Sequence, residues 1–314
     1  MSVLKQVTRI SNDQIIGEGK IDSILLFDQE KWTLYPLGEV GLPQLNFDNM
    51  ACDSRGQLWL YALLGETLCR FYGNTADVFR AGDRGLPSAS LLVLGFATDA
   101  EGGLWAAMGT EGVYRFDGAI WQRITLPDSG ISGHVTRVTT DHAGRIWLVV
   151  DNDDYTSFVL YDGKRWEEYA RVPISYKTDV VQALTIDKDG MLWVGWAEQG
   201  LWVLDRAGGL WTKHTTENSA LPDNHIRCIV VDKAGRVWVA GSGGITIFDG
   251  TESVCWRAII PDVPHGPLGH EDVMQARARG DDRPYLFIGN YLVIDSQSRI
   301  WALSGNGVSV FSEA

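Results

Sequence analysis

Along most of the chain, short apolar segments alternate with tight turns that contain glycine. In residues 181–186, apolar and polar positions alternate as they do in a β-strand. The next apolar segment places Leu192 and Val194 on one face of a strand and Trp193 on the other. A short turn with an aspartate and a glycine joins the two segments. This pattern predicts two antiparallel strands, the second of which is buried on both faces.

The same pattern, Asp-x-x-Gly-x-(Leu/Ile/Val)-Trp, recurs through the chain and defines a repeat unit. Its tryptophans, with one frayed copy at the end, are Trp59, Trp105, Trp147, Trp193, Trp238 and Trp301. By subtraction, successive tryptophans lie 46, 42, 46, 45 and 63 residues apart. A period of about 45 residues built of strand-like segments is typical of a β-propeller. We therefore expect these tryptophans to be structural residues, buried between adjacent blades.

Each repeat is predicted to contain four antiparallel strands. The third strand can be counted seven times, from residues 24–28 to residues 308–311. Residues 7–13 align with residues 135–141, which predicts a degenerate first blade with a shortened turn. The fold class is therefore an all-β propeller of four-stranded antiparallel blades, with seven blades preferred. The alternative has six blades, and residues near Trp32 then supply the strand missing from the final blade.

The repeats share one continuous stack of sheets, so residues 1–314 are predicted to form a single propeller domain. The widest spacing between tryptophans comes from an insertion at residues 261–284. Within it, residues 271–278 have acids at the start and an arginine in the last turn, as a short helix prefers. Such an insertion would act as a lid or as a docking element.

Several connections between repeats contain Gly-Leu-Pro, as in residues 41–43 and 85–87. Together with Asp-x-x-Gly-x-Leu-Trp-Val-Gly and Gly-x-x-x-Phe-Asp-Gly, this motif resembles the two-component regulator propeller repeat. That repeat occurs in sensor modules of bacterial hybrid histidine kinases and in stand-alone proteins. The resemblance covers nearly the whole chain and implies a recognition module. It is weakly specific for function, because its motifs mark turns and blade packing and include no reacting group.

Charge and composition limit the classes of partner that the protein is expected to bind. The chain has 27 basic and 40 acidic residues, a net charge of −13, which disfavours nucleic acids and anionic membrane surfaces. No apolar run reaches the roughly 18 residues of a membrane span, and the amino terminus lacks the apolar core of a secretory signal. The 4 cysteines show no metal-binding spacing and are expected to be buried thiols. We predict a cytoplasmic monomer that binds neither nucleic acid nor membrane.

The connections at one end of the predicted blades vary in length and chemistry, as expected for a binding face. Seven residues before the repeat aspartate, one equivalent position is occupied by Asn46, His134 and His225. If this position faces the axial mouth, these side chains converge on a ligand. The alternative is that they cap the starts of strands and are exposed to solvent. The ligand is expected to be a small molecule, a carbohydrate or a protein. The candidate ligand-binding residues are Asn46, His134, Tyr155, Tyr176, Trp196, Asp223, Asn224 and His225.

One loop is dense in carboxylates, with Asp151, Asp153 and Asp154 in five residues. Oxygen ligands at this density suit a calcium ion, but the loop lacks an EF-hand pattern, so a solvated loop is the favoured interpretation. No other cofactor is predicted. The repeat aspartates, such as Asp53, are expected to bond local amides in turns and to have no catalytic role.

The sequence contains no Gly-x-Ser-x-Gly, no phosphate-binding Gly-x-x-x-x-Gly-Lys and no His-Glu-x-x-His motif. We therefore favour a non-catalytic propeller that binds a ligand or a protein, as a sensor or scaffold module. The alternative is a metal-dependent enzyme, similar to propeller lactonases or lyases, with an axial site among the variable connections.

Overall fold

The computed structural model describes residues 6–9, 23–27, 32–43, 47–72, 74–126, 132–173, 180–205, 209–241, 243–249, 253–257, 291–294, 300–304 and 307–311. The strands within these ranges are short and antiparallel, and they form seven sheets. The chain divides into two compact units, Met1–Lys177 and Thr178–Ala314, and each unit is described here by itself. The insertion expected at residues 261–284 lies outside the described residues.

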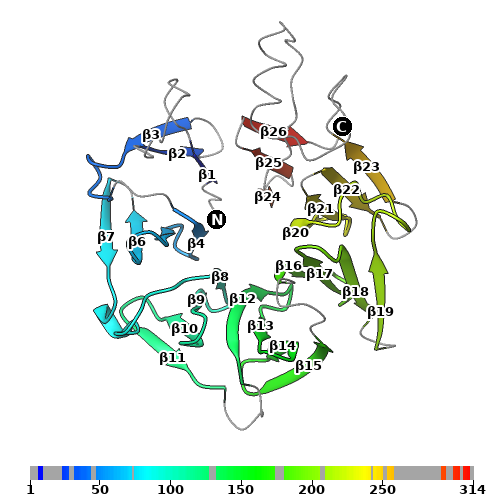
Figure 1. The fold of residues 1–314 in the computed structure, drawn as a ribbon. Coiled ribbons are helices and arrows are strands. Elements are labelled where there is room, and N and C mark those ends of the chain that lie inside the picture. The colour runs from blue at the N-terminus through cyan, green and yellow to red at the C-terminus, as the bar shows by residue number, and fades with distance from the viewer. Residues whose placement is uncertain are drawn as a thin grey trace, which may run out of the picture. The chain divides into compact units, whose positions relative to one another are not determined.

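The first unit begins with a three-stranded sheet, which is followed by three four-stranded blades (Figure 1). The N-terminal sheet consists of β1 (Gln6–Arg9), β2 (Ser23–Phe27) and β3 (Trp32–Pro36). Blade 1 consists of β4 (Asn49–Cys52), β5 (Leu58–Ala62), β6 (Thr67–Tyr72) and β7 (Thr75–Phe79). Blade 2, after the short 3-10 helix η1 (Asp83–Gly85), consists of β8 (Gly95–Thr98), β9 (Leu104–Ala107), β10 (Val113–Phe116) and β11 (Trp121–Ile124). Blade 3 consists of β12 (His134–Thr140), β13 (Ile146–Asp151), β14 (Tyr155–Tyr161) and β15 (Trp166–Pro173).

The second unit contains two four-stranded blades and a three-stranded sheet. Blade 4 consists of β16 (Val181–Ile186), β17 (Leu192–Trp196), β18 (Leu201–Asp205) and β19 (Leu210–His214). Blade 5 consists of β20 (Ile226–Val231), β21 (Val237–Gly241), β22 (Gly244–Phe248) and β23 (Ser253–Arg257). The C-terminal sheet consists of β24 (Tyr291–Ile294), β25 (Ile300–Ser304) and β26 (Gly307–Phe311).

The blade count predicted from sequence is wrong. The described residues form five four-stranded blades, not seven or six, and the two terminal sheets have three strands each. In the N-terminal sheet, β1 pairs directly with β2, with Val7 opposite Leu26. Residues 7–13 look like a first strand, but β1 pairs directly with the strand that carries Leu26, and the sequence of residues 10–22 lacks the Asp-x-x-Gly-x-(Leu/Ile/Val)-Trp pattern.

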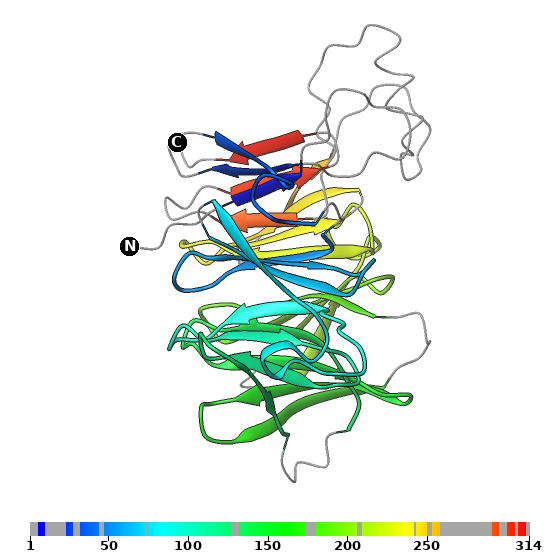
Figure 2. The same ribbon diagram turned by 90° about the vertical axis from the view of Figure 1, so that its left-hand side faces the viewer.

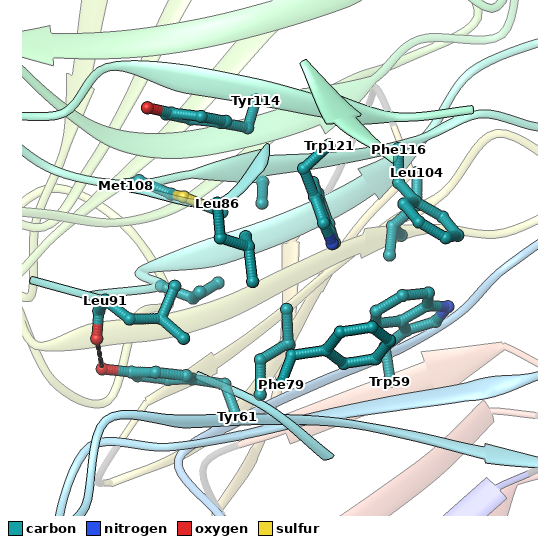
Figure 3. Packing of buried hydrophobic residues seen from close by; sticks show 13 residues of the cluster. Trp59, Tyr61, Phe79, Leu86, Leu91, Leu104, Met108, Tyr114, Phe116 and Trp121 are labelled. Carbon is teal, nitrogen blue, oxygen red and sulfur yellow. Dashed lines mark hydrogen bonds between the residues drawn. The ribbon is translucent and has the colours of Figure 1, made fainter. Parts of the chain in front are cut away.

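The second strand of each blade is buried on both faces, as the pattern predicts. All five residues of β5 are buried, and Trp59 is fully enclosed. Its ring packs on Phe79 of the same blade and on Phe116 and Trp121 of blade 2, at centroid distances of 4.9 to 5.6 Å (Figure 3). The aromatic residues therefore join blade 1 to blade 2, where Trp59 and Trp121 each remove a large apolar area from water.

The other repeat tryptophans with described side chains also pack against aromatic or apolar residues. Trp105 packs on Tyr161 and Trp166 of blade 3, and Trp147 is buried against Tyr169. In the second unit, Trp193 is half-buried against Phe248 of blade 5, and Trp238 packs in a cluster with Leu292 and Ile300 of the C-terminal sheet. The burial of these side chains supports the structural role expected for them, while the side chain of Trp301 lies outside the description.

Within each unit, the first strands of successive blades lie side by side, as with β4 and β8, β8 and β12, and β16 and β20. In the first unit, threonine hydroxyls form hydrogen bonds between these first strands. Thr98 Oγ1 donates to the carbonyl of Cys52 at 3.2 Å, and Thr140 Oγ1 donates to the carbonyl of Thr98 at 2.9 Å. These bonds recur one repeat apart and fix the spacing of the first strands.

Candidate functional site

Antiparallel pairing divides the connections of every blade between two ends (Figure 2). The turns from the first to the second strand and from the third to the fourth lie at one end, which we call the Asp-turn end. The connections from the second to the third strand, and from the fourth strand to the next blade, lie at the opposite loop end.

At the Asp-turn end, the repeat aspartate of every four-stranded blade accepts the backbone amide four residues on and the indole N–H of the repeat tryptophan. In blade 3, one carboxylate oxygen of Asp141 accepts hydrogen bonds from the amides of Ala143 and Arg145, at 2.9 and 3.0 Å. The other oxygen accepts the indole N–H of Trp147 at 3.1 Å. Bonds of 2.7 to 3.1 Å from indole to carboxylate recur in the pairs Asp53–Trp59, Asp99–Trp105, Asp187–Trp193 and Asp232–Trp238.

Arginines reinforce three of these turns. Arg115 Nε donates to Asp99 at 2.6 Å, and the same kind of bond joins Arg145 to Asp141 and Arg236 to Asp232. Burial of these three carboxyl groups raises their pKa, but the hydrogen bonds from arginine, indole and backbone outweigh burial and bring each pKa below its usual value. The repeat aspartates are therefore structural, as expected.

Sequence reasoning missed the bond from indole to carboxylate. The signal was present, because the tryptophan always follows the aspartate by the same number of residues. Neighbouring turns are also linked. Ser54 Oγ donates to the carbonyl of Gly102 at 3.0 Å, and Lys188 Nζ donates to that of Ala234 at 3.4 Å. The Asp-turn end therefore serves as scaffold in each unit.

The loop end differs from blade to blade. In blade 1 the β5–β6 hairpin exposes Leu63 and Leu64, which are 49% and 73% accessible. The Asp48 carboxylate accepts the amide of Leu63 at 2.7 Å, and Glu66 accepts the amide of Leu91 at 3.1 Å. Glu66 has a φ of 43°, a left-handed conformation that non-glycine residues rarely adopt. Its own carboxylate bond to the following connection helps to hold it there.

The connection between blades 1 and 2 contains a second such residue, Arg84, with a φ of 47°. Its guanidinium lies 5.4 Å from the ring centroid of Phe79, and Asp83 accepts the amide of Arg80 at 2.7 Å. Among the described residues, Glu66 and Arg84 are the non-glycine residues with positive φ, and both lie at the loop end. Strain of this kind clusters at binding sites.

In blade 3, His134 begins β12 and is exposed, opposite Asp151 of β13. The two carboxylate oxygens of Asp151 accept the hydroxyls of Thr136 and Thr156, at 2.8 and 2.6 Å. Asp151 is therefore engaged within its own blade. His134 is placed where the strand pattern predicts, at the loop end of a first strand.

Asn152 closes the acidic loop, because its side-chain oxygen accepts the amides of Asp154 and Tyr155 at 2.9 Å each. Asp153 and Asp154 are exposed. In the part of the chain that the structure describes, no group of three or more His, Cys, Asp or Glu side chains is arranged to hold a metal ion. A solvated acidic loop stays the prediction, and calcium at Asp151, Asp153 and Asp154 stays the alternative to it.

Tyr155 is half-buried beneath Arg171, whose guanidinium carbon lies 3.8 Å from the ring centroid. Arg171 is held in turn by two bonds of 2.8 Å to Glu168. The ring face under Arg171 is therefore occupied by a cation–π contact.

Trp196, the end of β17, is only 2% exposed and packs 5.5 Å from the ring of Trp202. Its indole nitrogen has no hydrogen-bond partner among the described residues. The structure places this side chain in the interior, where it cannot stack on a ligand from solvent without a rearrangement of the blade.

Asp223, Asn224 and His225 are half-buried in the segment that leads into β20. The Asp223 carboxylate accepts the amide of His225 at 2.8 Å. The carbonyl of Asn224 accepts the amide of Gly200 at 2.9 Å, and its side-chain oxygen accepts the amide of Thr216 at the same distance. These bonds attach the loop end of blade 4 to the start of blade 5. Of the remaining candidates, Asn46 and Tyr176 lie outside the described residues.

The first strands of blades 3, 4 and 5 share a feature that sequence reasoning also missed. Each has an irregular register near its loop end, where one extra residue forms a β-bulge. The extra residues are Thr136, Gln182 and Arg227, each five positions before its repeat aspartate. The available signal was a spacing of three between buried residues, as between Ile226 and Ile229, where a regular strand requires two or four.

Repeated four-stranded antiparallel sheets, with first strands side by side and tryptophans between blades, define a β-propeller protein. The two component regulator propeller family matches residues 220–243, which include the Asp turn of blade 5. This match confirms the resemblance drawn from the repeat motifs. A search of curated proteins finds no significant sequence match.

Solved structures share the fold. The virginiamycin B lyase of Staphylococcus aureus has a TM-score of 0.62 and 14% identity over 98% of this chain and 99% of the lyase. A gluconolactonase of Xanthomonas campestris has a TM-score of 0.54 and 15% identity over 97% and 94%. The extracellular domain of a protein classed as a hybrid two component system of B. thetaiotaomicron has a TM-score of 0.59 and 16% identity.

The match to that extracellular domain covers 92% of this chain but 39% of the solved chain. At these identities the similarity shows the fold alone. No helix in the described ranges is long and apolar enough to cross a membrane.

Proposed function

We propose that this protein is a non-catalytic recognition module that binds a ligand or a protein partner at the loop end of its blades. The contrast between the two ends carries this proposal. At the Asp-turn end, five blades repeat one set of bonds from an aspartate to backbone and indole. At the loop end, connections vary, leucines are exposed, and two non-glycine residues hold positive φ angles. Such division is expected when a rigid scaffold presents variable binding segments.

The similarity to propeller domains of two-component systems supports a sensor role for this module. The ligand would be a small molecule, a carbohydrate or a protein, and the exposed His134 would contribute to its recognition. The net charge of −13 supports the absence of nucleic acid and anionic membranes among the partners. A monomer in the cytoplasm stays our working assignment, and the extracellular location of the similar two-component domain is its main rival.

Thermal-shift measurements with a panel of saccharides, peptides and divalent cations test this function. We expect at least one compound to raise the melting temperature, because a ligand that binds only the native state stabilises it. The shift should fall in His134→Ala and persist in Arg55→Ala, which alters an exposed residue of the Asp-turn end. Equal shifts in both variants would contradict a loop-end site.

The second candidate function is a metal-dependent lyase or lactonase. Whole-chain similarity to a solved lyase and a solved gluconolactonase favours it. Metal analysis of the purified protein and assays on a lactone panel separate the two functions. Hydrolysis that disappears with EDTA would establish the enzyme and overturn the recognition module.

A further inference from the structure

One titratable side chain lies in the contact between blades 4 and 5. His214 is the last residue of β19, the outer strand of blade 4 (Figure 1). Its imidazole is half-buried, and its ring centroid lies 5.4 Å from that of Phe248 in β22 of blade 5. Trp193 packs on the same Phe248 ring at 5.6 Å. His214 therefore belongs to the aromatic contact that the repeat tryptophan makes with the next blade.

The pairing register identifies the equivalent of His214 in every four-stranded blade. In blade 4, Gly195 of the second strand pairs with Leu201 of the third, which pairs with His214 of the fourth. In blade 1 the same row ends in Phe79, which stacks on Trp59 and is 2% exposed. The remaining blades have Ile124, Ala170 and Trp256 at this place. Among the five described blades, blade 4 is thus the one with a titratable residue in this row.

Burial lowers the pKa of His214 below the usual histidine value of about 6.5, because the charged imidazolium loses water in the contact between blades. Lys213 points to the opposite face of β19, where its Nζ lies over the ring of Trp202. The other charged groups on the surrounding elements are Asp205, Glu217, Asp223, Arg227 and Asp249. A carboxylate paired with the imidazole would raise its pKa, so the lowered pKa indicates that burial outweighs these charges.

The direction of this pKa shift sets the effect of pH on the contact. The unfolded chain binds a proton at this histidine below about pH 6.5, whereas the folded chain keeps the imidazole neutral to lower pH. The contact therefore contributes its full stability above about pH 6.5 and loses stability as the pH falls toward the lowered pKa.

The chain that follows His214 connects blade 4 to blade 5. The amide of Thr216 donates to the side-chain oxygen of Asn224, and the amide of Gly200 donates to the Asn224 carbonyl, at 2.9 Å each. If the end of β19 separates from blade 5, these two bonds lose the packing that holds them in place.

We propose that His214 makes the contact between the outer strand of blade 4 and blade 5 sensitive to pH, so that the end of β19 and residues 215–225 open in mild acid. Opening lets the imidazolium reach water, which its packing on Phe248 prevents in the closed form. The opening segment includes Asp223, Asn224 and His225, and it opens whether or not the loop end binds a ligand.

Hydrogen exchange of the full chain tests this proposal at about pH 7.5 and about pH 5.5, on either side of the usual histidine pKa. The measured quantity is the protection of the Gly200 and Thr216 amides, corrected for the intrinsic effect of pH on exchange. We expect protection to fall several-fold at the lower pH in the wild type. In His214→Phe, which places the blade 1 residue in blade 4, protection should be nearly unchanged.

His214→Gln is a second variant, because glutamine does not titrate and does not enlarge the side chain as phenylalanine does. His142→Gln is the matched control, since it removes an exposed imidazole from the Asp turn of blade 3, and it should behave as the wild type. Unchanged protection in the wild type, or an equal fall in wild type, His214→Phe and His214→Gln, would overturn the proposal. An NMR titration that gives His214 a pKa at or above about 6.5 would do the same.

Discussion

Replacing Gly144 with alanine tests the contact between neighbouring Asp turns. Gly144 has a φ of 75°, and an added Cβ would lie 3.2 Å from the Cα of Ala100 in blade 2 and closer still to its Cβ. Gly56, at the equivalent position of blade 1, has a φ of 73°, and an added Cβ would meet nothing within 4 Å. The two substitutions therefore impose the same backbone strain, but only one creates a clash.

The magnitudes follow from this difference. A left-handed conformation costs an alanine about 1–2 kcal/mol, and we expect Gly56→Ala to lose that amount. Overpacking costs about 1–3 kcal/mol more, so Gly144→Ala should lower the free energy of unfolding by about 2–5 kcal/mol in total. Gly235→Ala should fall between them, because its Cβ would meet only the end of the flexible Lys188 side chain.

Urea unfolding followed by tryptophan fluorescence measures these losses. A double-mutant cycle sharpens the test, because Ala100→Gly removes the opposing Cβ and should recover most of the extra loss in Gly144→Ala. Equal losses in Gly56→Ala and Gly144→Ala, or no recovery in the double variant, would refute the contact between turns.

Three further predictions concern the same framework. Burial raises the pKa of Asp141, but hydrogen bonds from Trp147 and Arg145 lower it by more, so the net pKa lies below its usual value. The stability that the ionised carboxylate adds to the fold is therefore present above about pH 4 and is lost as the pH falls through the lowered pKa. Asp141→Asn should therefore lose about 1–3 kcal/mol in urea unfolding at neutral pH and much less in acid. Trp59→Ala should lose about 3–5 kcal/mol by the same assay, because it opens a cavity between blades 1 and 2. Millimolar calcium chloride should leave the melting temperature unchanged, because Asp151 already accepts two hydroxyls, and a clear rise lost in Asp153→Asn would establish calcium in that loop.

The fold class could be predicted because the apolar pattern of each repeat determines how its strands must be buried. A strand that is apolar on both faces, as around Trp59, can only lie between two neighbours. The blade count could not be predicted in the same way. Residues 7–13 have the composition of a first strand, but composition does not choose a pairing partner, and β1 pairs with the strand that carries Leu26.

Candidate site residues were harder to predict, because polarity and position in a loop do not determine exposure. Trp196 is the last residue of β17, a strand that is apolar on both faces, and it is buried like Val194 and Gly195 before it. Asn224 has the residue type of a ligand contact, yet its oxygens accept backbone amides that attach one blade to the next. In a repeat protein, polar groups at strand ends often satisfy the backbone of the neighbouring repeat.

The β-bulges give a further test of how the first strands pack. Three blades keep the same irregularity, but the extra residue is Thr136, Gln182 or Arg227. Flanking residues such as Ile226 pack in the cluster between blades 4 and 5, and Arg227 is itself half-buried. Arg227→Thr, which places the blade 3 residue in blade 5, should therefore lower the free energy of unfolding by about 0.5–3 kcal/mol, the usual range for a position that is not fully exposed. An unchanged free energy of unfolding in urea would refute a contribution of this half-buried side chain to the packing of β20.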